Sequence, residues 1–234
     1  MATWVTHLWV ADRLMERFPR LHRRGFCVGS IAPDCNVENE DWTAFTPPRA
    51  VTHWMQGSRK SEADSDAFRN ACLQDLADAG EERQAFLLGY YAHLIADGEL
   101  QRYTRDEARV AAVWRRIDAD ESLRKKAEGL PRTWDSVKKL IVKAERAREI
   151  YAMEAEYLKE HPQSGYLTEI LPLREFPDYL EYLPHGAIVR KIGVMGYIPQ
   201  RAEEETFIAF SRAEFAFYVE NTVKLAAEKL RACM

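Results

Sequence analysis

The chain has 234 residues, of which 47% are hydrophobic and 30% charged, and its formal net charge is −4 at pH 7. This length suffices for one large domain with a sizeable hydrophobic core. The mild charge gives no electrostatic reason to expect nucleic acid or an anionic membrane as a partner. No apolar run approaches the roughly 20 residues that span a bilayer, and the N-terminal segment lacks the pattern of a secretory signal. We therefore expect a cytoplasmic protein with free thiols at its four cysteines, Cys27, Cys35, Cys72 and Cys233.

Helical periodicity dominates the chain. Apolar residues from Trp4 to Phe18 follow the i, i+3, i+4, i+7 spacing of a helix, and Thr3 is placed to cap it. Residues 25–57 are rich in glycine, proline and asparagine, which predicts a long structured loop with one short helix after Pro48. Further helices are predicted over residues 61–79, 81–103, 104–128, 133–159 and 202–230, with short turns between residues 161 and 200. A strand over residues 189–198 remains open, although no partner strand is evident.

The resulting expectation is an all-α, multi-helix bundle that carries long structured loops. We expect residues 1–234 to form one domain, since no linker or repeat divides them.

The predicted central helix holds two polar residues where apolar ones are expected. In FLLGYYAHLIADGELQRY, residues 86–103, His93 and Asp97 lie on the apolar stripe. A buried ionised carboxylate costs several kcal/mol unless a partner compensates it. Taken alone, His93 would be a hydrogen-bonded core histidine and Asp97 the partner of an arginine. Their i, i+4 spacing, however, places both side chains on one face, where a single divalent cation could bind both.

Three further residues share this unusual setting. His7 lies on the apolar stripe of the first helix, Asp34 follows Pro33 in GSIAPD, and His53 lies in VTHW. Proline fixes φ, so it stiffens the backbone that presents Asp34. Nitrogen and oxygen donors in this mixture suit zinc or another first-row metal.

The sequence resembles the bacterial zinc-dependent phospholipase C family, and within it a short cytoplasmic branch, at five positions in chain order: His7, Asp34, His53, His93 and Asp97. The resemblance covers about residues 1–105 and leaves residues 106–234 as a helical C-terminal part. It implies an all-α, phospholipase C-like fold, related to that of the single-strand-specific zinc nucleases.

The resemblance also implies a ligand set. Asp34, His53, His93 and Asp97 would bind one zinc ion, and Asp97 would bridge to a second ion bound by His7. In secreted members, a free N-terminal tryptophan completes this second site, whereas Trp4 has no free amine. No HxxxE or HxxxD follows Asp97 to form a third site. We therefore expect one Zn²⁺ ion, and a second ion or another first-row metal remains open.

The function implied by the resemblance is metal-dependent hydrolysis of a phosphoester, with activated water as nucleophile and Asp34 as general base. The substrate would be a lipid, as for a phospholipase C, or a soluble phosphodiester or phosphomonoester. Two alternatives remain open. Four protein ligands could instead fill a structural zinc site in a non-catalytic helical binding module, or the five residues could form a hydrogen-bonded network without metal. Glu214, on the apolar stripe of the last helix, is either an ion-pair partner or exposed at the edge of the stripe, or else it supports or supplements the metal ligands.

Overall fold

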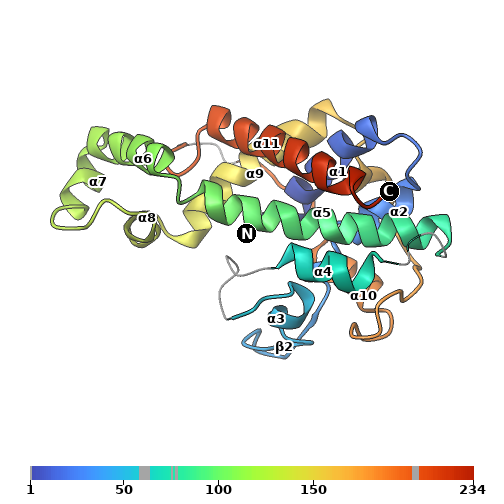
Figure 1. Cartoon of the computed structure of the whole chain (residues 1–234). Helices are drawn as coiled ribbons and strands as arrows, with labels where there is room; N and C mark the ends of the chain where they lie inside the picture. The colour runs from blue at the N-terminus through green and yellow to red at the C-terminus, as the bar shows by residue number, and fades with distance from the viewer. Residues whose placement is uncertain (1, 58–63, 75, 77–78, 202–205) are drawn as a thin grey trace.

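The computed structural model has an all-α architecture built around one long helix, α5 (Glu81–Tyr103), as Figure 1 shows. The structure describes residues 2–57, 64–74, 76, 79–201 and 206–234. Within these ranges the only strands are β1 (Val37–Glu38) and β2 (Phe45–Thr46), which form a small antiparallel pair. The predicted all-α class is confirmed. No helix in the described ranges is long and apolar enough to cross a membrane.

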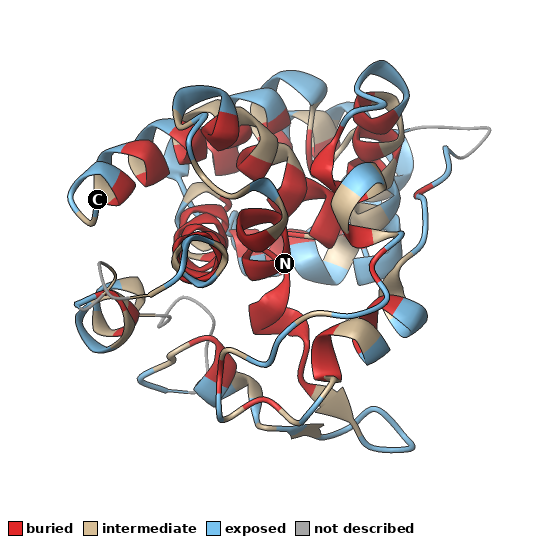
Figure 2. Cartoon of the chain, turned by 90° about the vertical axis from the view of Figure 1, so that its right-hand side faces the viewer, coloured by how far each residue is buried: buried red, intermediate tan, exposed pale blue. Residues whose placement is uncertain are grey.

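The first and central helices form where the apolar periodicity predicted them. In α1 (Trp4–Arg17), the side chain of Thr3 accepts a hydrogen bond from the backbone N–H of Thr6 and so caps the helix. The apolar stripe of α1 is buried, with Leu8 and Leu14 fully inaccessible. Buried residues lie on the helix faces that turn inward, and exposed residues lie on the outer faces (Figure 2). One buried hydrophobic cluster includes residues from α1 through α11 (Arg212–Arg231).

Helix α2 (Arg23–Gly29) packs directly on α5 through glycines. A Cβ atom added at Gly29 would lie 2.0 Å from the carbonyl oxygen of Phe86, and one added at Gly89 would lie 2.2 Å from that of Phe26. Both distances are far below van der Waals contact, so only glycine allows the two backbones to approach this closely. The same contact holds the segment after α2 against the middle of α5.

The segment over residues 25–57, which was predicted to be a long loop, is partly helical. It contains most of α2, the 3₁₀ turn η1 (Ala32–Asp34), the β1–β2 hairpin and the short helix α3 (Arg49–Thr52) that was expected after Pro48. The prediction missed α2 because Gly25 and Gly29 lower helix propensity, and tertiary packing overrides that preference here. The four cysteines are free, as predicted.

The later helices differ from the prediction mainly in their ends. The helix predicted over residues 61–79 is α4 (Ser65–Cys72), capped by Asp64, while residues 61–63, 75, 77 and 78 of that prediction lie outside the described ranges. Two predicted helices are each divided by a break, which gives α6 (Glu107–Ala119), α7 (Glu121–Lys126), α8 (Trp134–Leu140) and α9 (Lys143–Glu160). The segment between residues 161 and 200 contains a π-helical turn, η4 (Tyr166–Ile170), and α10 (Ala187–Met195), which occupies the possible strand. The last helix was predicted from residue 202, but residues 202–205 lie outside the described ranges. Residues 206–210 are not helical, and α11 begins at Arg212, where Ser211 caps it.

Candidate metal centre

The structure brings all five predicted ligands together in the interior. They come from α1, the end of η1, the residue after α3, and two successive turns of α5. Each side chain is buried, with exposed fractions between 0% and 6%. His53 Nε2 lies 3.4 Å from Asp34 Oδ1 and 3.7 Å from Asp97 Oδ2. His7 Nε2 lies 3.6 Å from Asp97 Oδ1, and the rings of His7 and His93 stack with their centroids 3.7 Å apart.

Within the described residues, two sets of three side chains could each hold a metal ion. One set is His7, His93 and Asp97, and the other is Asp34, His53 and His93. In each set the potential ligand atoms all lie within 4.8 Å of one another. Asp97 lies between the sets, because one of its oxygens faces His7 and the other faces His53. This arrangement can accommodate one ion and offers a bridging carboxylate to a second.

Neighbouring groups orient the histidine rings. The Nδ1 atom of His93 lies 2.8 Å from the carbonyl oxygen of Ser30, so this nitrogen carries the proton and Nε2 is left as the electron-pair donor. Thr52 Oγ1 lies 2.9 Å from Nδ1 of His53, and this hydrogen bond restrains the orientation of that ring. The close packing of Gly29 and Gly89 places Ser30 beside α5, so the glycine contact also positions the centre.

The protonation state of His93 suits a metal ligand. Burial, followed by the neighbouring His7, lowers the pKa of His93 well below its ordinary value, so the ring is neutral near pH 7. His93 Nε2 is buried and makes no hydrogen bond within the described ranges. A buried nitrogen in this state is costly in a purely structural core, whereas neutral imidazole is the form that binds metal. The donor set therefore fits a first-row divalent cation.

A comparison with models of protein families gives a match over the part of the chain that contains these residues. Residues 6–98 match the family model of zinc-dependent phospholipase C. Over these residues the chain is similar to the zinc-dependent phospholipase C family. The match begins one residue before His7 and ends one residue after Asp97, so it contains all five residues of the candidate metal centre. Comparisons with curated proteins and with solved structures gave no significant match.

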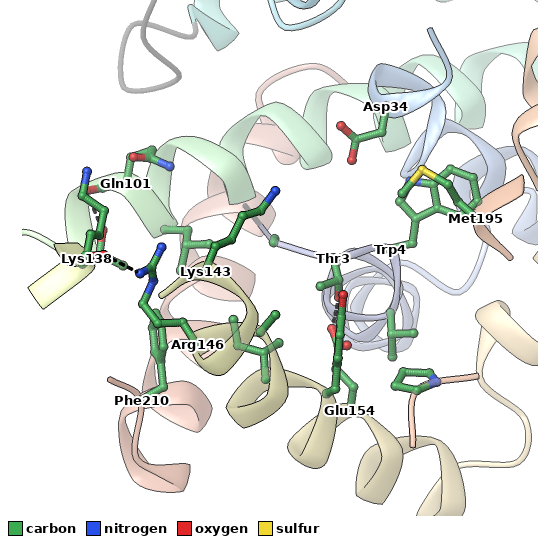
Figure 3. A pocket seen from close by; sticks show the side chains of 18 of the residues that line it. Thr3, Trp4, Asp34, Gln101, Lys138, Lys143, Arg146, Glu154, Met195 and Phe210 are labelled. Atoms are coloured by element: carbon green, nitrogen blue, oxygen red, sulfur yellow. Dashed lines mark hydrogen bonds between the residues drawn. The ribbon is translucent and has the colours of Figure 1, made fainter. Parts of the chain in front are cut away.

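A cavity of about 470 Å³ adjoins the candidate metal centre, and Asp34 belongs to its lining (Figure 3). Aromatic and aliphatic side chains make up much of the wall, including Trp4, Trp134, Ile150 and Phe210. A cavity of this volume can hold a ligand several times larger than water beside Asp34.

The sequence analysis missed Glu154, which also lines this cavity. Glu154 is fully buried in α9 and accepts hydrogen bonds from the hydroxyl groups of Thr3 and Thr6 at the start of α1. It thereby ties α9 to the helix that carries His7. The sequence did contain a signal, because Ile150, Glu154 and Tyr157 fall on one buried stripe of α9, as His93 and Asp97 do on α5.

Glu214 lies in an ion pair. Arg116 Nη2 donates to both carboxylate oxygens of Glu214, at 3.0 and 2.7 Å, and the backbone N–H of Ser211 donates to Oε2 at 2.9 Å. The ion-pair interpretation is confirmed. The remaining histidines have other contacts: His22 caps α2, His161 stacks on Tyr157, and His185 is 99% exposed and pairs with Asp178.

Replacing Glu154 with glutamine is expected to make stability less dependent on pH. Burial raises the pKa of Glu154 from 4.5 to about 7, so the folded protein keeps a proton that the unfolded chain releases. The wild-type free energy of unfolding should therefore fall by about 3 kcal/mol as pH rises from about 4.5 to about 7 because of this group. The Glu154→Gln variant should lack this loss. Urea unfolding of both proteins at pH 5 and pH 8 measures it, and equal losses in both would contradict the assignment.

Proposed function

We propose that the chain is a metal-dependent phosphoester hydrolase whose residues 1–234 act as one domain. The observation that carries the proposal is the buried, unbonded Nε2 of His93, surrounded by four further donor side chains inside the family segment. The proposed ligands are His7, Asp34, His53, His93 and Asp97. The hydrophobic cluster that runs from α1 to α11 supports the single domain.

The ligands divide between one principal ion and one further ion. Asp34, His53, His93 and Asp97 would hold the principal zinc ion. Nε2 of His93 has one electron pair to donate and can bind only one ion. A second ion would therefore rely on His7 Nε2 and Asp97 Oδ1, which lie 3.6 Å apart. Two ligands bind less tightly than four, so the second ion is the weaker one.

A bound divalent cation would supply two kinds of chemistry, a more acidic water and stabilisation of negative charge on phosphoryl oxygen. Asp34 both lines the cavity and belongs to the centre, so its carboxylate is placed to orient the attacking water and accept its proton. Ser30 and Thr52 hold the rings of His93 and His53 in their donor orientation throughout. The apolar cavity wall holds the organic part of the substrate and limits the entry of bulk water.

The test is hydrolysis by the zinc-loaded protein of bis(p-nitrophenyl) phosphate, p-nitrophenyl phosphate, p-nitrophenylphosphorylcholine and a short-chain phosphatidylcholine. We expect turnover of at least one ester, and its loss on removal of zinc. Asp34→Asn should lower kcat by about 100-fold or more, while His161→Ala, which changes a histidine away from the centre, should leave it unchanged. A protein that holds zinc stoichiometrically but turns over none of these esters would instead be a binding module with a structural metal.

A further inference from the structure

The cavity wall that lies away from Asp34 is strongly cationic. Its lining includes Arg105 after α5, Lys138 on α8, and Lys143 and Arg146 on α9. Figure 3 shows Lys138, Lys143 and Arg146 on one side of the cavity, with Asp34 and Trp4 on the other. These four cations come from three different elements, so no single amphipathic helix accounts for their convergence.

Two of these cations occupy an electrostatically unfavourable place. Lys143 and Arg146 lie in the first turn of α9, where the helix dipole is positive and acidic residues are preferred. Arg146 is nonetheless fixed there, because Nη1 donates to the backbone carbonyls of Lys138, at 3.2 Å, and Ile141. Burial lowers the pKa of Arg146, which shows that its surroundings disfavour the charge. An arginine held rigidly at such a position is well placed to receive an anion.

Nearby acidic side chains are mostly engaged elsewhere. Glu145 accepts from the backbone N–H of Val142, and Glu149 accepts from three backbone N–H groups at residues 208–210. The exception is Asp135, which pairs with Lys138 of the cavity wall itself at 2.5 Å. Within the described part of the chain, the ammonium group of Lys143 has neither an ion pair nor a hydrogen bond, so the wall retains net positive charge.

Apolar side chains stand directly beside these cations. Trp134 on α8, Ile150 on α9 and Phe210 before α11 line the same cavity. Arg109 lies over the rings of Trp134 and Phe210, at 4.7 and 4.3 Å from their centroids, and fixes these rings from behind. A ligand that matches this wall carries both an anionic group and a hydrophobic or aromatic group.

We propose that this cationic wall binds a second anionic group of the substrate, so that the enzyme acts on amphiphilic phosphoesters with negative charge beyond the phosphate that is cleaved. A phosphomonoester or similar dianion next to an apolar group has the required chemistry. That the bound molecule is a substrate rests on the proposed function, whereas anion binding by the wall does not. The same chemistry occurs in an anionic lipid headgroup and in a soluble organic phosphate.

The test is calorimetric titration of zinc-free protein with phenylphosphonate, an aromatic dianion that cannot be hydrolysed at a phosphoester. We expect the double variant Lys138→Met/Lys143→Met to bind it about tenfold more weakly than wild type. The matched control is Lys139→Met, which removes an exposed charge from α8 that does not line the cavity. The proposal is overturned if phenylphosphonate binds no more tightly than uncharged benzyl alcohol, or if the double variant binds it as well as Lys139→Met does.

A second arm separates the two sources of the anion. The protein is tested for co-sedimentation with phosphatidylcholine vesicles, with and without phosphatidic acid. Binding only to the vesicles with phosphatidic acid identifies the anion as a lipid headgroup, and the double variant should lose this binding. Phenylphosphonate binding without vesicle binding assigns a soluble phosphate. The titration uses zinc-free protein, so its result does not depend on whether the enzyme turns over a substrate. Conversely, a failed titration would overturn anion binding by the wall but would not bear on the hydrolase assignment.

Discussion

Replacing His93 with alanine is expected to weaken zinc binding by more than about 100-fold, which exceeds the effect of losing an outer hydrogen-bond partner of a ligand. His93 is the side chain common to both possible metal sets, so its loss removes a donor from each. Competition with a chromophoric chelator measures the affinity directly. The result does not depend on knowing the substrate.

The matched control is His161→Ala, because this histidine hydrogen-bonds to the Tyr157 carbonyl and lies outside both sets. It should retain wild-type zinc affinity. Circular dichroism of both variants without metal separates loss of the site from loss of the fold. A folded His93→Ala protein that binds zinc as tightly as wild type would remove His93 from the proposed centre.

Replacing Gly89 with alanine is expected to destabilise the fold by about 3 kcal/mol or more, at the upper end of the usual range for overpacking. The new Cβ would lie 2.2 Å from the Phe26 carbonyl oxygen and 3.0 Å from the Ser30 nitrogen, and both are backbone atoms that no side-chain rotation can move. Since Ser30 orients His93, the same substitution should also weaken zinc binding.

Gly98→Ala provides the control on the same helix. Among the described residues, no atom outside the local backbone of α5 lies within 4 Å of a Cβ built at Gly98, so alanine there should stabilise α5 by about 0.5–1 kcal/mol. Urea unfolding of the two variants measures both effects. If Gly89→Ala is as stable as Gly98→Ala, the close contact between α2 and α5 is not required.

Local sequence patterns predicted the parts of the fold in which each helix has its own clear stripe. Helix α5 has the predicted bounds, and α1 begins after its predicted cap, Thr3. The prediction missed α2 because its glycines are required by the close contact with α5, and α5 is distant in sequence. The prediction also missed the breaks within the helices at residues 104–128 and 133–159. The sequence keeps its helical periodicity through Asp120 and Ile141, where the breaks occur.

The candidate site was predictable to the extent that its residues violate a local pattern. His7, His93 and Asp97 are polar residues on apolar stripes. Asp34 and His53 were predicted from the motifs in which they lie and from the order of those motifs along the chain. The cationic cavity wall had no comparable signal. Lys138, Lys143 and Arg146 resemble ordinary surface charges in sequence, and only the packing of α8 and α9 near the start of α1 places them around the cavity with Asp34.

Anomalous diffraction at the zinc edge, from crystals of protein purified without a histidine tag or added chelator, tests the central claim most directly. The account predicts a strong anomalous peak bounded by Asp34, His53, His93 and Asp97, with any second, weaker peak between His7 and Asp97. A crystal soaked in zinc that shows no peak among these side chains, with their carboxylates and imidazoles hydrogen-bonded to one another, would contradict a metal centre.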